Sequence, residues 1–345
     1  MKTPRILIIY TGGTIGMKED PDTLALVPFD FSQISQEVPQ IRKFGYEIEA
    51  DSFDAPIDSS DAGPKLWIKI ASHIEKRYNE FDGFVVLHGT DTMAYSASAL
   101  SFMLDNLEKP VIFTGSQLPI GMLRTDGAEN LISSIEIAAS RGLDGSPMVP
   151  EVCVYFQNQL FRANRTTKYN AENFHAFSSA NYPPLAEVGI HIDFNTRLIN
   201  YPSQRGWPLG VNTSLDTSVI SVKLVPGMSE SGFASICATP GIKAIVIESF
   251  GTGNVPSDEW FVKPLREAAA RGVLLVNVSQ CAAGKVDMDA YANGRVMKDL
   301  GAVSGYDATF ESVITKLYCL LGAHKDLNMV KRLMNMNLKG EISKK

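Results

Sequence analysis

The sequence predicts an α/β protein of two domains, with a larger N-terminal, mostly parallel sheet flanked by helices on both faces and a smaller C-terminal α/β domain. Short apolar runs alternate with helix-length amphipathic segments, which is typical of parallel sheets. A stretch rich in Asn, Pro and Gly interrupts this alternation, and 345 residues suffice for two cores. We therefore expect an N-terminal domain at 1–190, a linker at 191–215 and a C-terminal domain at 216–345.

The elements of the first domain follow from the placement of its apolar residues. Continuous apolar runs predict buried strands, and an apolar stripe at helical spacing predicts a helix that starts at Pro64, with Asp61 as a possible cap. In chain order we expect strands 5–10 and 46–53, helix 64–78, strand 83–87, helix 94–104, strand 110–114, helix 127–139 and strand 152–156.

The alternation resumes after the linker and predicts the second domain. Its strands and helices follow the same apolar patterns as those of the first. We expect strand 218–224, helix 231–238, strand 244–248, helix 258–271, strand 273–278 and helices 309–321 and 327–334.

Composition excludes several classes of function. The net charge is −6, and no basic run stands out except the terminal Lys344–Lys345, so we expect no nucleic-acid partner. The apolar runs are too short to cross a bilayer, and residues 6–10 are too short for a signal peptide, so we expect a cytoplasmic protein without membrane contact. The four cysteines form no C-x-x-C pair and the histidines lack metal-ligand spacing. We expect buried free thiols and no metal or organic cofactor.

Two threonine-bearing turns follow predicted strands. Thr11–Gly16 reads T-G-G-T-I-G, and His88–Thr92 reads H-G-T-D-T. Both belong to the sheet edge where α/β proteins bind ligands. Glycines there free backbone N–H groups for an oxyanion, while Thr14 and Thr90 supply hydroxyls. The acidic, proline-broken run at 17–23 argues against phosphate binding and is interpreted as a lid. A purely structural turn is the alternative.

A hydroxyl nucleophile needs a base, and a lysine is the candidate. His88 ends its strand, so its side chain should point to one face of the sheet and serve a structural role. Lys168 lies in a polar loop with the sequence R-T-T-K, and desolvation or neighbours can make a lysine basic. Asp91 could orient this base and bind a substrate ammonium, or it could cap the helix at 94–104.

Further hydroxyls follow other predicted strands. Ser59 and Ser60, within D-S-S-D, precede a helix and suit a carboxylate, although a capping role is the alternative. Ser116, within G-S-Q after strand 110–114, is a similar candidate.

These motifs together resemble those of the bacterial-type L-asparaginases. T-G-G-T-I and H-G-T-D-T are the two signature turns of that family, and the form H-G-T-D-T-M-A-Y resembles its cytoplasmic type I branch. The other matching motifs keep the family order, with D-S-S-D at 58–61, G-S-Q-L-P at 115–119, R-T-T-K at 165–168 and G-T-G-N at 251–254.

The resemblance implies hydrolysis of L-asparagine to L-aspartate and ammonia. Thr14 would attack the side-chain amide and carry a β-aspartyl ester, while Lys168 acts as base with Thr90 and Asp91. The family's shared site implies a homodimer or dimer of dimers, in which the C-terminal domain completes the site across the subunit interface. The implied substrate-binding residues are Ser59, Ser60, Thr90, Asp91, Ser116 and Asn254.

Two departures from the family pattern affect these expectations. Leu26 stands where many members carry a lid tyrosine, so Thr11 or a water would activate Thr14, or the lid would act by excluding water. No glutamate accompanies Asn254 at the far wall of the site, and we expect glutaminase activity to be weak or absent.

Three hypotheses stay open. Regulation could act through the segment around Cys281, in a region that allosteric members use. The chain could instead resemble the archaeal-type Glu-tRNA amidotransferase subunit, which shares these motifs. It could also bind amino acids without turnover, although all four catalytic positions are intact.

Overall fold

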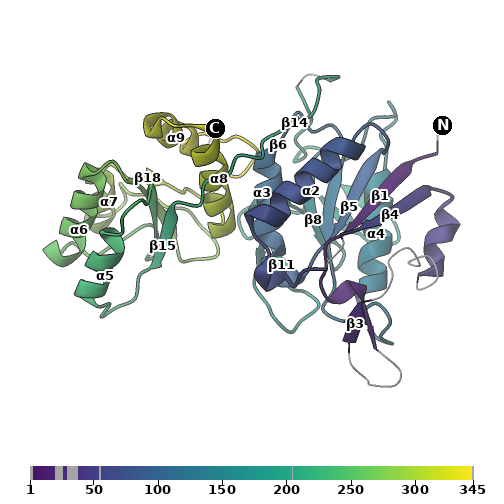
Figure 1. Ribbon diagram of the computed structural model, residues 1–345, viewed down its shortest axis with the longest axis horizontal. Helices are drawn as coiled ribbons and strands as arrows, with labels where there is room; N and C mark the ends of the chain where they lie inside the picture. Colours follow the sequence, from purple (N-terminus) through teal and green to yellow (C-terminus); the bar gives the residue numbers. More distant parts are fainter. Residues whose placement is uncertain (1–2, 20–25, 29–37, 54–55, 204, 344–345) are drawn as a thin grey trace. The chain divides into compact units, whose positions relative to one another are not determined.

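The structure is a computed structural model that describes residues 3–19, 26–28, 38–53, 56–203 and 205–343 (Figure 1). Every strand and helix expected from the sequence is present, with ends that differ by at most two residues. The predicted α/β class is therefore confirmed. The lid interpretation falls partly outside the described residues, because 20–25 are not among them.

The chain forms two compact units, Met1–Thr213 and Ser214–Lys345. The first is built on an eight-stranded sheet in the order β13-β12-β9-β8-β7-β5-β1-β4. The strands from β4 to β8 run parallel, and β9, β12 and β13 continue the sheet antiparallel. Their bounds are β1 Arg5–Tyr10, β4 Glu47–Ser52, β5 Gly83–Leu87, β7 Val111–Thr114, β8 Val152–Phe156, β9 Gln159–Arg162, β12 Ala186–Val188 and β13 Ile192–Phe194.

Helices cover both faces of this sheet. Ile6 and Ile8 of β1 pack in one core cluster with Leu131 and Ile135 of α4. Successive strand residues face opposite sides, so the fully buried Leu7 lies on the other face. That face is covered by α2 and α3 (Figure 1). The three helices are α2 Pro64–Arg77, α3 Met93–Met103 and α4 Gly127–Ala139.

The sheet brings the carboxyl ends of three strands to one edge. Tyr10 of β1 is in register with Leu87 of β5, and Leu87 with Thr114 of β7. The ladder continues into the turns, because the Thr11 N–H donates to the Leu87 carbonyl at 3.0 Å and the His88 N–H to the Thr114 carbonyl at 2.9 Å. The turns that follow β1, β5 and β7 therefore lie next to one another.

Short elements shape the segments around this edge. Four 3₁₀ turns carry or flank the candidate residues: η1 Thr14–Gly16, η4 Ser59–Asp61, η5 Thr90–Thr92 and η6 Ala163–Arg165. The other elements that the described residues of this unit form are η3 Pro39–Phe44 and the antiparallel pairs β2 Met17–Glu19 with β3 Leu26–Pro28, β10 Thr167–Lys168 with β11 Phe177–Ser178, and β6 Leu104–Asp105 with β14 Gly210–Val211.

The second unit is a parallel four-stranded sheet in the order β15-β16-β17-β18. One face packs against α5 and α6, and the other against α8 and α9. The elements are β15 Val219–Lys223, α5 Glu230–Cys237, β16 Ala244–Ser249, α6 Glu259–Ala270, β17 Leu274–Ser279, α7 Ala292–Asp299, β18 Val303–Ser304, α8 Phe310–Ala323 and α9 Leu327–Met334.

The segment expected as a linker is more ordered than the sequence indicated. Within 191–215, β13 pairs with β12 and β14 pairs with β6, so the segment adds to the first unit up to Thr213. Strands of two or three residues give too few apolar positions to show an alternating pattern. The two compact units divide after Thr213.

The thiols follow the expectation at three of four positions. Cys153, Cys237 and Cys319 are buried and free, but Cys281 is exposed, so the expectation of burial is wrong there. Burial raises the pKa of the Cys237 thiol to about 11. No helix in the described residues is long and apolar enough to span a membrane. The same residues hold no cluster of three or more potential metal ligands.

Candidate active site

Backbone packing brings the first turn against its neighbours. Gly12 and Gly13 have φ angles of 133° and 90°, which L side chains rarely adopt. A Cβ on Gly13 would lie 2.5 Å from the Gly89 nitrogen, and one on Gly12 would overlap the Ile57 backbone. The Ile57 N–H donates to the Thr11 carbonyl at 2.9 Å. The two signature turns and the 57–61 segment therefore meet backbone to backbone.

Thr14 begins η1 directly after Gly13 and is half-buried. Ile15 beside it is fully buried and anchors the turn. Thr11, considered from the sequence as an activator of Thr14, is buried, and its hydroxyl donates to the Leu87 carbonyl at 2.9 Å. Leu26 lies in β3, and Thr23–Ala25 lie outside the described residues.

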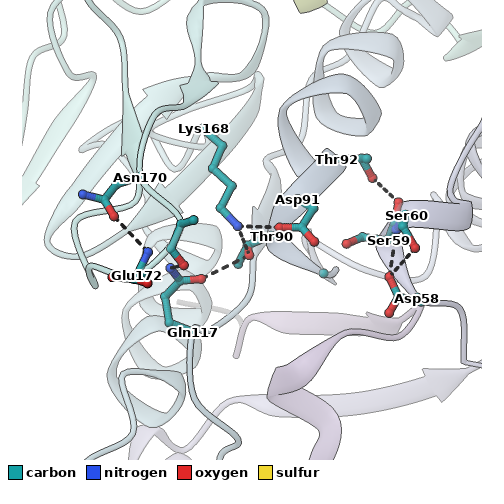
Figure 2. A network of polar contacts seen from close by, with 12 residues as sticks. Asp58, Ser59, Ser60, Thr90, Asp91, Thr92, Gln117, Lys168, Asn170 and Glu172 are labelled. Carbon is teal, nitrogen blue, oxygen red and sulfur yellow. Dashed lines mark hydrogen bonds and ion pairs between the residues drawn. The ribbon is translucent and has the colours of Figure 1, made fainter.

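The second turn carries a connected polar group (Figure 2). The Lys168 Nζ lies 2.8 Å from the Thr90 Oγ1 and 2.6 Å from an Asp91 carboxylate oxygen. The Lys168 side chain is 13% exposed, whereas that of Asp91 is 68% exposed. The lysine is thus largely desolvated, while Asp91 keeps surface for another cation. Asp91 makes no capping bond, since α3 has its N-cap at Thr92, so that alternative is wrong.

A strand pair positions Lys168, which the sequence had placed in a polar loop. β10 pairs with β11, and Lys168 is in register with Phe177. The Thr166 hydroxyl, fully buried, donates to the Arg162 carbonyl at 2.8 Å. The chain before Lys168 is therefore fixed, which limits the positions that its ammonium group can reach.

The D-S-S-D segment serves partly as a cap. The Ser60 N–H and hydroxyl both donate to one Asp58 oxygen, at 2.8 and 2.9 Å, and these bonds hold the pKa of the Asp58 carboxyl below its usual value. Ser59 is buried, its carbonyl accepts from the Thr92 hydroxyl at 2.6 Å, and a Cβ on Gly89 would lie 2.6 Å from its Oγ. Ser59 thus packs directly on the second turn (Figure 2).

The G-S-Q segment contributes Gln117, which the sequence reasoning did not single out. The Thr90 hydroxyl lies 3.2 Å from the Gln117 Oε1. The Ser116 hydroxyl donates to the Leu118 carbonyl of its own loop. Both Asp126 oxygens accept from the Gln117 N–H, at 3.1 and 3.0 Å. The position of Gln117 in the G-S-Q motif was the available signal.

His88 is structural, as expected. It is 1% exposed, its Nδ1 lies 2.8 Å from the Gly89 carbonyl and its Nε2 lies 2.9 Å from the Ser96 hydroxyl. The Trp67 indole donates to the same hydroxyl at 2.8 Å. Burial lowers the pKa of His88 to about 4, so the ring is neutral near pH 7 and donates through Nδ1.

Asn254 lies in the second unit, in a tight turn after β16. Its N–H donates to the Phe250 carbonyl at 2.8 Å, and the Phe250 N–H donates back at 2.9 Å. The Asn277 amide donates to the Gly253 carbonyl at 3.0 Å and supports this turn.

The comparisons with known proteins decide the family. An asparaginase N-terminal family model matches residues 5–200, and a glutaminase/asparaginase C-terminal domain model matches residues 218–334. The chain belongs to the asparaginase family. This confirms the resemblance and the enzyme class that it implied.

The relatives include a type I enzyme by name. The chain is 40% identical to L-asparaginase 1 of Escherichia coli K12, over 99% of both chains. It is 38% identical to the solved L-asparaginase I of Vibrio cholerae, with a TM-score of 0.89 over 99% of this chain and 100% of that one. It is also 39% identical to a mouse protein named 60 kDa lysophospholipase, over 98% of this chain but only 62% of the mouse protein.

Proposed function

We propose that this enzyme hydrolyses L-asparagine to L-aspartate and ammonia, with Thr14 as nucleophile and weak or absent glutaminase activity. The observation that carries the proposal is the contact of the largely buried Lys168 ammonium with the Thr90 hydroxyl and Asp91. A desolvated lysine against a hydroxyl at a sheet edge is the arrangement that base-assisted hydroxyl chemistry needs.

In the first step, the Thr14 oxygen attacks the side-chain amide carbon of asparagine. The Gly13 and Thr90 N–H groups are our candidates to stabilise the oxyanion. The carbon–nitrogen bond breaks, the leaving nitrogen takes the threonine proton through a water, and ammonia departs. The aspartyl group stays on Thr14 as an ester.

In the second step, water cleaves the ester. Lys168, acting through the Thr90 hydroxyl, takes the water proton as the new carbon–oxygen bond forms, and the Thr14 oxygen regains a proton as it leaves. Asp91 is exposed on one side and paired with Lys168 on the other, which suits a second role in holding the substrate ammonium. Ser59 and Ser60 would take the α-carboxylate, with Ser116 a weaker candidate.

We further propose that Asn254 reaches the site from a second subunit, in a homodimer or a dimer of dimers. The C-terminal domain would begin near residue 216 and complete the site in this way. A cytoplasmic location stays a prediction, as does regulation through the segment around Cys281.

The test is ammonia release from L-asparagine and L-glutamine by the wild type, Thr14→Ala and Lys168→Met. We expect both variants to lose at least about a thousandfold in kcat. Lys243→Met is the matched control, because Lys243 pairs with Asp216 at 2.6 Å in the second unit. A wild type that releases no ammonia would reject the proposal; lysophospholipid hydrolysis and Glu-tRNA amidation would then be assayed next.

A further inference from the structure

A buried hydrogen-bond relay runs from α2 to the second threonine turn. The Trp67 indole N–H donates to the Ser96 hydroxyl at 2.8 Å, and this hydroxyl lies 2.9 Å from the His88 Nε2. The His88 Nδ1 lies 2.8 Å from the Gly89 carbonyl. The three side chains of the relay are at most 4% exposed. The relay therefore ends, inside the core, on the carbonyl of the peptide bond that joins Gly89 to Thr90.

The proton directions in this relay follow from its two ends. The Gly89 carbonyl can only accept, so the His88 Nδ1 carries a proton and donates to it. Burial lowers the pKa of His88 to about 4, so the ring is neutral near pH 7 and its Nε2 has no proton. The Ser96 hydroxyl must then donate to Nε2. At the other end, the Trp67 indole can only donate, and it supplies the Ser96 oxygen with a hydrogen bond in return.

The relay holds the tilt of the Gly89–Thr90 peptide plane. Such a plane can turn about the line between its two Cα atoms while both atoms stay in place, through opposite changes in the ψ before it and the φ after it. Gly89 has a φ of −65° and a ψ of 143°, and because it has no Cβ it offers little resistance to this motion. The hydrogen bond from the buried His88 ring opposes the motion at the carbonyl oxygen.

Fixing the carbonyl also fixes the N–H on the other side of the bond. The peptide bond is trans, so the Gly89 carbonyl and the Thr90 N–H lie in one plane and point in opposite directions. The carbonyl points to the His88 ring, and the Thr90 N–H therefore points away from it. The other tautomer of the ring would set a bare Nδ1 against the carbonyl oxygen, and two acceptors that face each other would push the plane out of this position.

We propose that His88 is a positioning residue for the reaction: by holding the Gly89 carbonyl, it aims the Thr90 N–H at the oxyanion that forms on the substrate. Ser96 and Trp67 assist by keeping the ring in the tautomer that donates from Nδ1. The role of the Thr90 N–H in turnover rests on the proposed function, whereas the proton order of the relay does not. An oxyanion donor acts on charge that develops in the transition state, so its misalignment should lower kcat more than it changes KM.

The backbone of His88 is held without its ring, so that the ring can be exchanged for other side chains. Its N–H donates to the Thr114 carbonyl at 2.9 Å, and Leu87 before it is in register with Thr114 of β7. Substitutions at this position can therefore be compared on the same strand end.

Two amide side chains at position 88 separate positioning from core packing. The asparagine nitrogen is as many bonds from Cβ as the histidine Nδ1, so His88→Asn keeps a donor toward the Gly89 carbonyl and loses the group that faces Ser96. The glutamine nitrogen corresponds to Nε2, so His88→Gln keeps a partner for Ser96 and loses the donor to Gly89.

The measurement is steady-state ammonia release by both variants. We expect His88→Gln to lower kcat by about 10–100-fold with KM within a few-fold, and His88→Asn to keep kcat within about fivefold of the wild type. A side chain that only fills the core would give the reverse order, because glutamine is closer to histidine in size. Equal losses of kcat, or the larger loss in His88→Asn, overturn the inference.

Ser96→Ala tests the middle of the relay, and Ser134→Ala is its matched control. Both serines are fully buried on helices, but the Ser134 hydroxyl donates to the Asn130 carbonyl of its own helix at 2.7 Å. We expect Ser96→Ala to lower kcat about three- to tenfold and Ser134→Ala to keep it within about twofold. Equal values of kcat in the two variants overturn the assignment of Ser96 to the relay.

A further measurement needs neither turnover nor a variant. In protein labelled with ¹⁵N-histidine, NMR shows which nitrogen of each ring carries a proton. His88 is recognised as the ring that stays neutral while the pH falls through the range in which exposed histidines titrate. We expect its proton on Nδ1 near pH 7, and a proton on Nε2 overturns the inference. This result decides if neither amide variant folds, and a wild type that releases no ammonia would reject the proposed function without changing it.

Discussion

The two threonine turns differ in the side-chain hydrogen bonds that their threonine hydroxyls make. At 88–92 the Thr90 hydroxyl bonds to both Lys168 and Gln117. At 11–16, no side chain in the described part of the chain is seen to bond to the Thr14 hydroxyl, and residues 20–25 of the adjoining segment lie outside that part. The difference indicates that the fold itself sets the contacts of the Thr90 hydroxyl.

The largest expected effect distinguishes Thr90, whose hydroxyl we propose takes part in the reaction, from Thr11, whose hydroxyl bonds to the backbone. Thr90→Val should lower kcat for ammonia release by about 10²–10⁴-fold, because the proton path to Lys168 is lost. Thr11→Val should keep kcat within a few-fold and cost about 1 kcal/mol in unfolding free energy, since only the bond to the Leu87 carbonyl is lost. Steady-state kinetics and urea unfolding measure both. Equal losses of kcat would remove the distinction between the turns.

A second substitution breaks the contact between the turns. Gly13→Ala places a methyl group 2.5 Å from the Gly89 nitrogen at a φ of 90°, so it should lower kcat/KM by about 100-fold through displacement of both turns. Gly45→Ala is the control for strain alone, because Gly45 has a φ of 67° and open space around its Cα. It should cost about 1 kcal/mol in stability and leave activity unchanged. Comparable activity losses in the two variants would contradict this account.

A third prediction concerns the histidine beneath the second turn. His88 is neutral in the folded protein, with its pKa lowered to about 4, whereas an unfolded histidine titrates near 6.5. The unfolded chain therefore binds more protons between these values. Keeping His88 neutral therefore stabilises the folded protein in full above about pH 6.5. As the pH falls toward 4, the free energy of unfolding loses this contribution, which amounts to up to about 3 kcal/mol.

His88→Gln should remove that part of the pH dependence. The measurement is urea unfolding of the wild type and the variant at several values between pH 4 and pH 7. His191→Gln controls for an exposed histidine. A variant whose unfolding free energy falls with acid as steeply as that of the wild type would show that His88 is not the group responsible.

The smallest expected effect concerns residues 57–61, the segment that packs against both threonine turns. Asp58→Ala removes the acceptor of two Ser60 donors and should cost about 0.5–2 kcal/mol in unfolding free energy. This variant keeps the Ser60 hydroxyl and removes only the carboxylate that accepts from it. KM for asparagine should therefore rise only a few-fold, with kcat unchanged. Ser60→Ala tests whether the hydroxyl itself binds substrate. A fall in kcat in either variant would place this segment in the chemistry.

The sequence predicted the long elements well, because β1, β5, β7 and β8 are mostly apolar runs and helices such as α2 have an apolar stripe. Among the elements that it missed are β9, β12, β13, α7, β18 and the short pairs β2–β3, β10–β11 and β6–β14, which are short or have few apolar positions. Their pairing depends on partners far along the chain, as for β12 with β9, and local pattern carries no such information.

The candidate residues were found from the motifs at strand ends, but their contacts were not. The family resemblance implied that Thr90, Asp91 and Lys168 act together, yet only the folded chain shows Lys168 on β10 opposite Phe177. Gln117 escaped notice because its amide donates to two carbonyls of the 170–173 turn, which any residue type could supply. The capping alternative for the D-S-S-D segment is confirmed at Asp58, whose carboxyl accepts from the Ser60 N–H.

The most direct test of the central claim is to look for the aspartyl ester on Thr14. The wild type is mixed with excess L-asparagine, quenched in acid within the first turnovers and digested for mass spectrometry. We predict that the peptide containing Thr14 gains the mass of one aspartyl group, and that Thr14→Ala shows none under the same conditions. The same adduct on the peptide containing Thr90, with Thr14 unmodified, would contradict the assignment of the two turns.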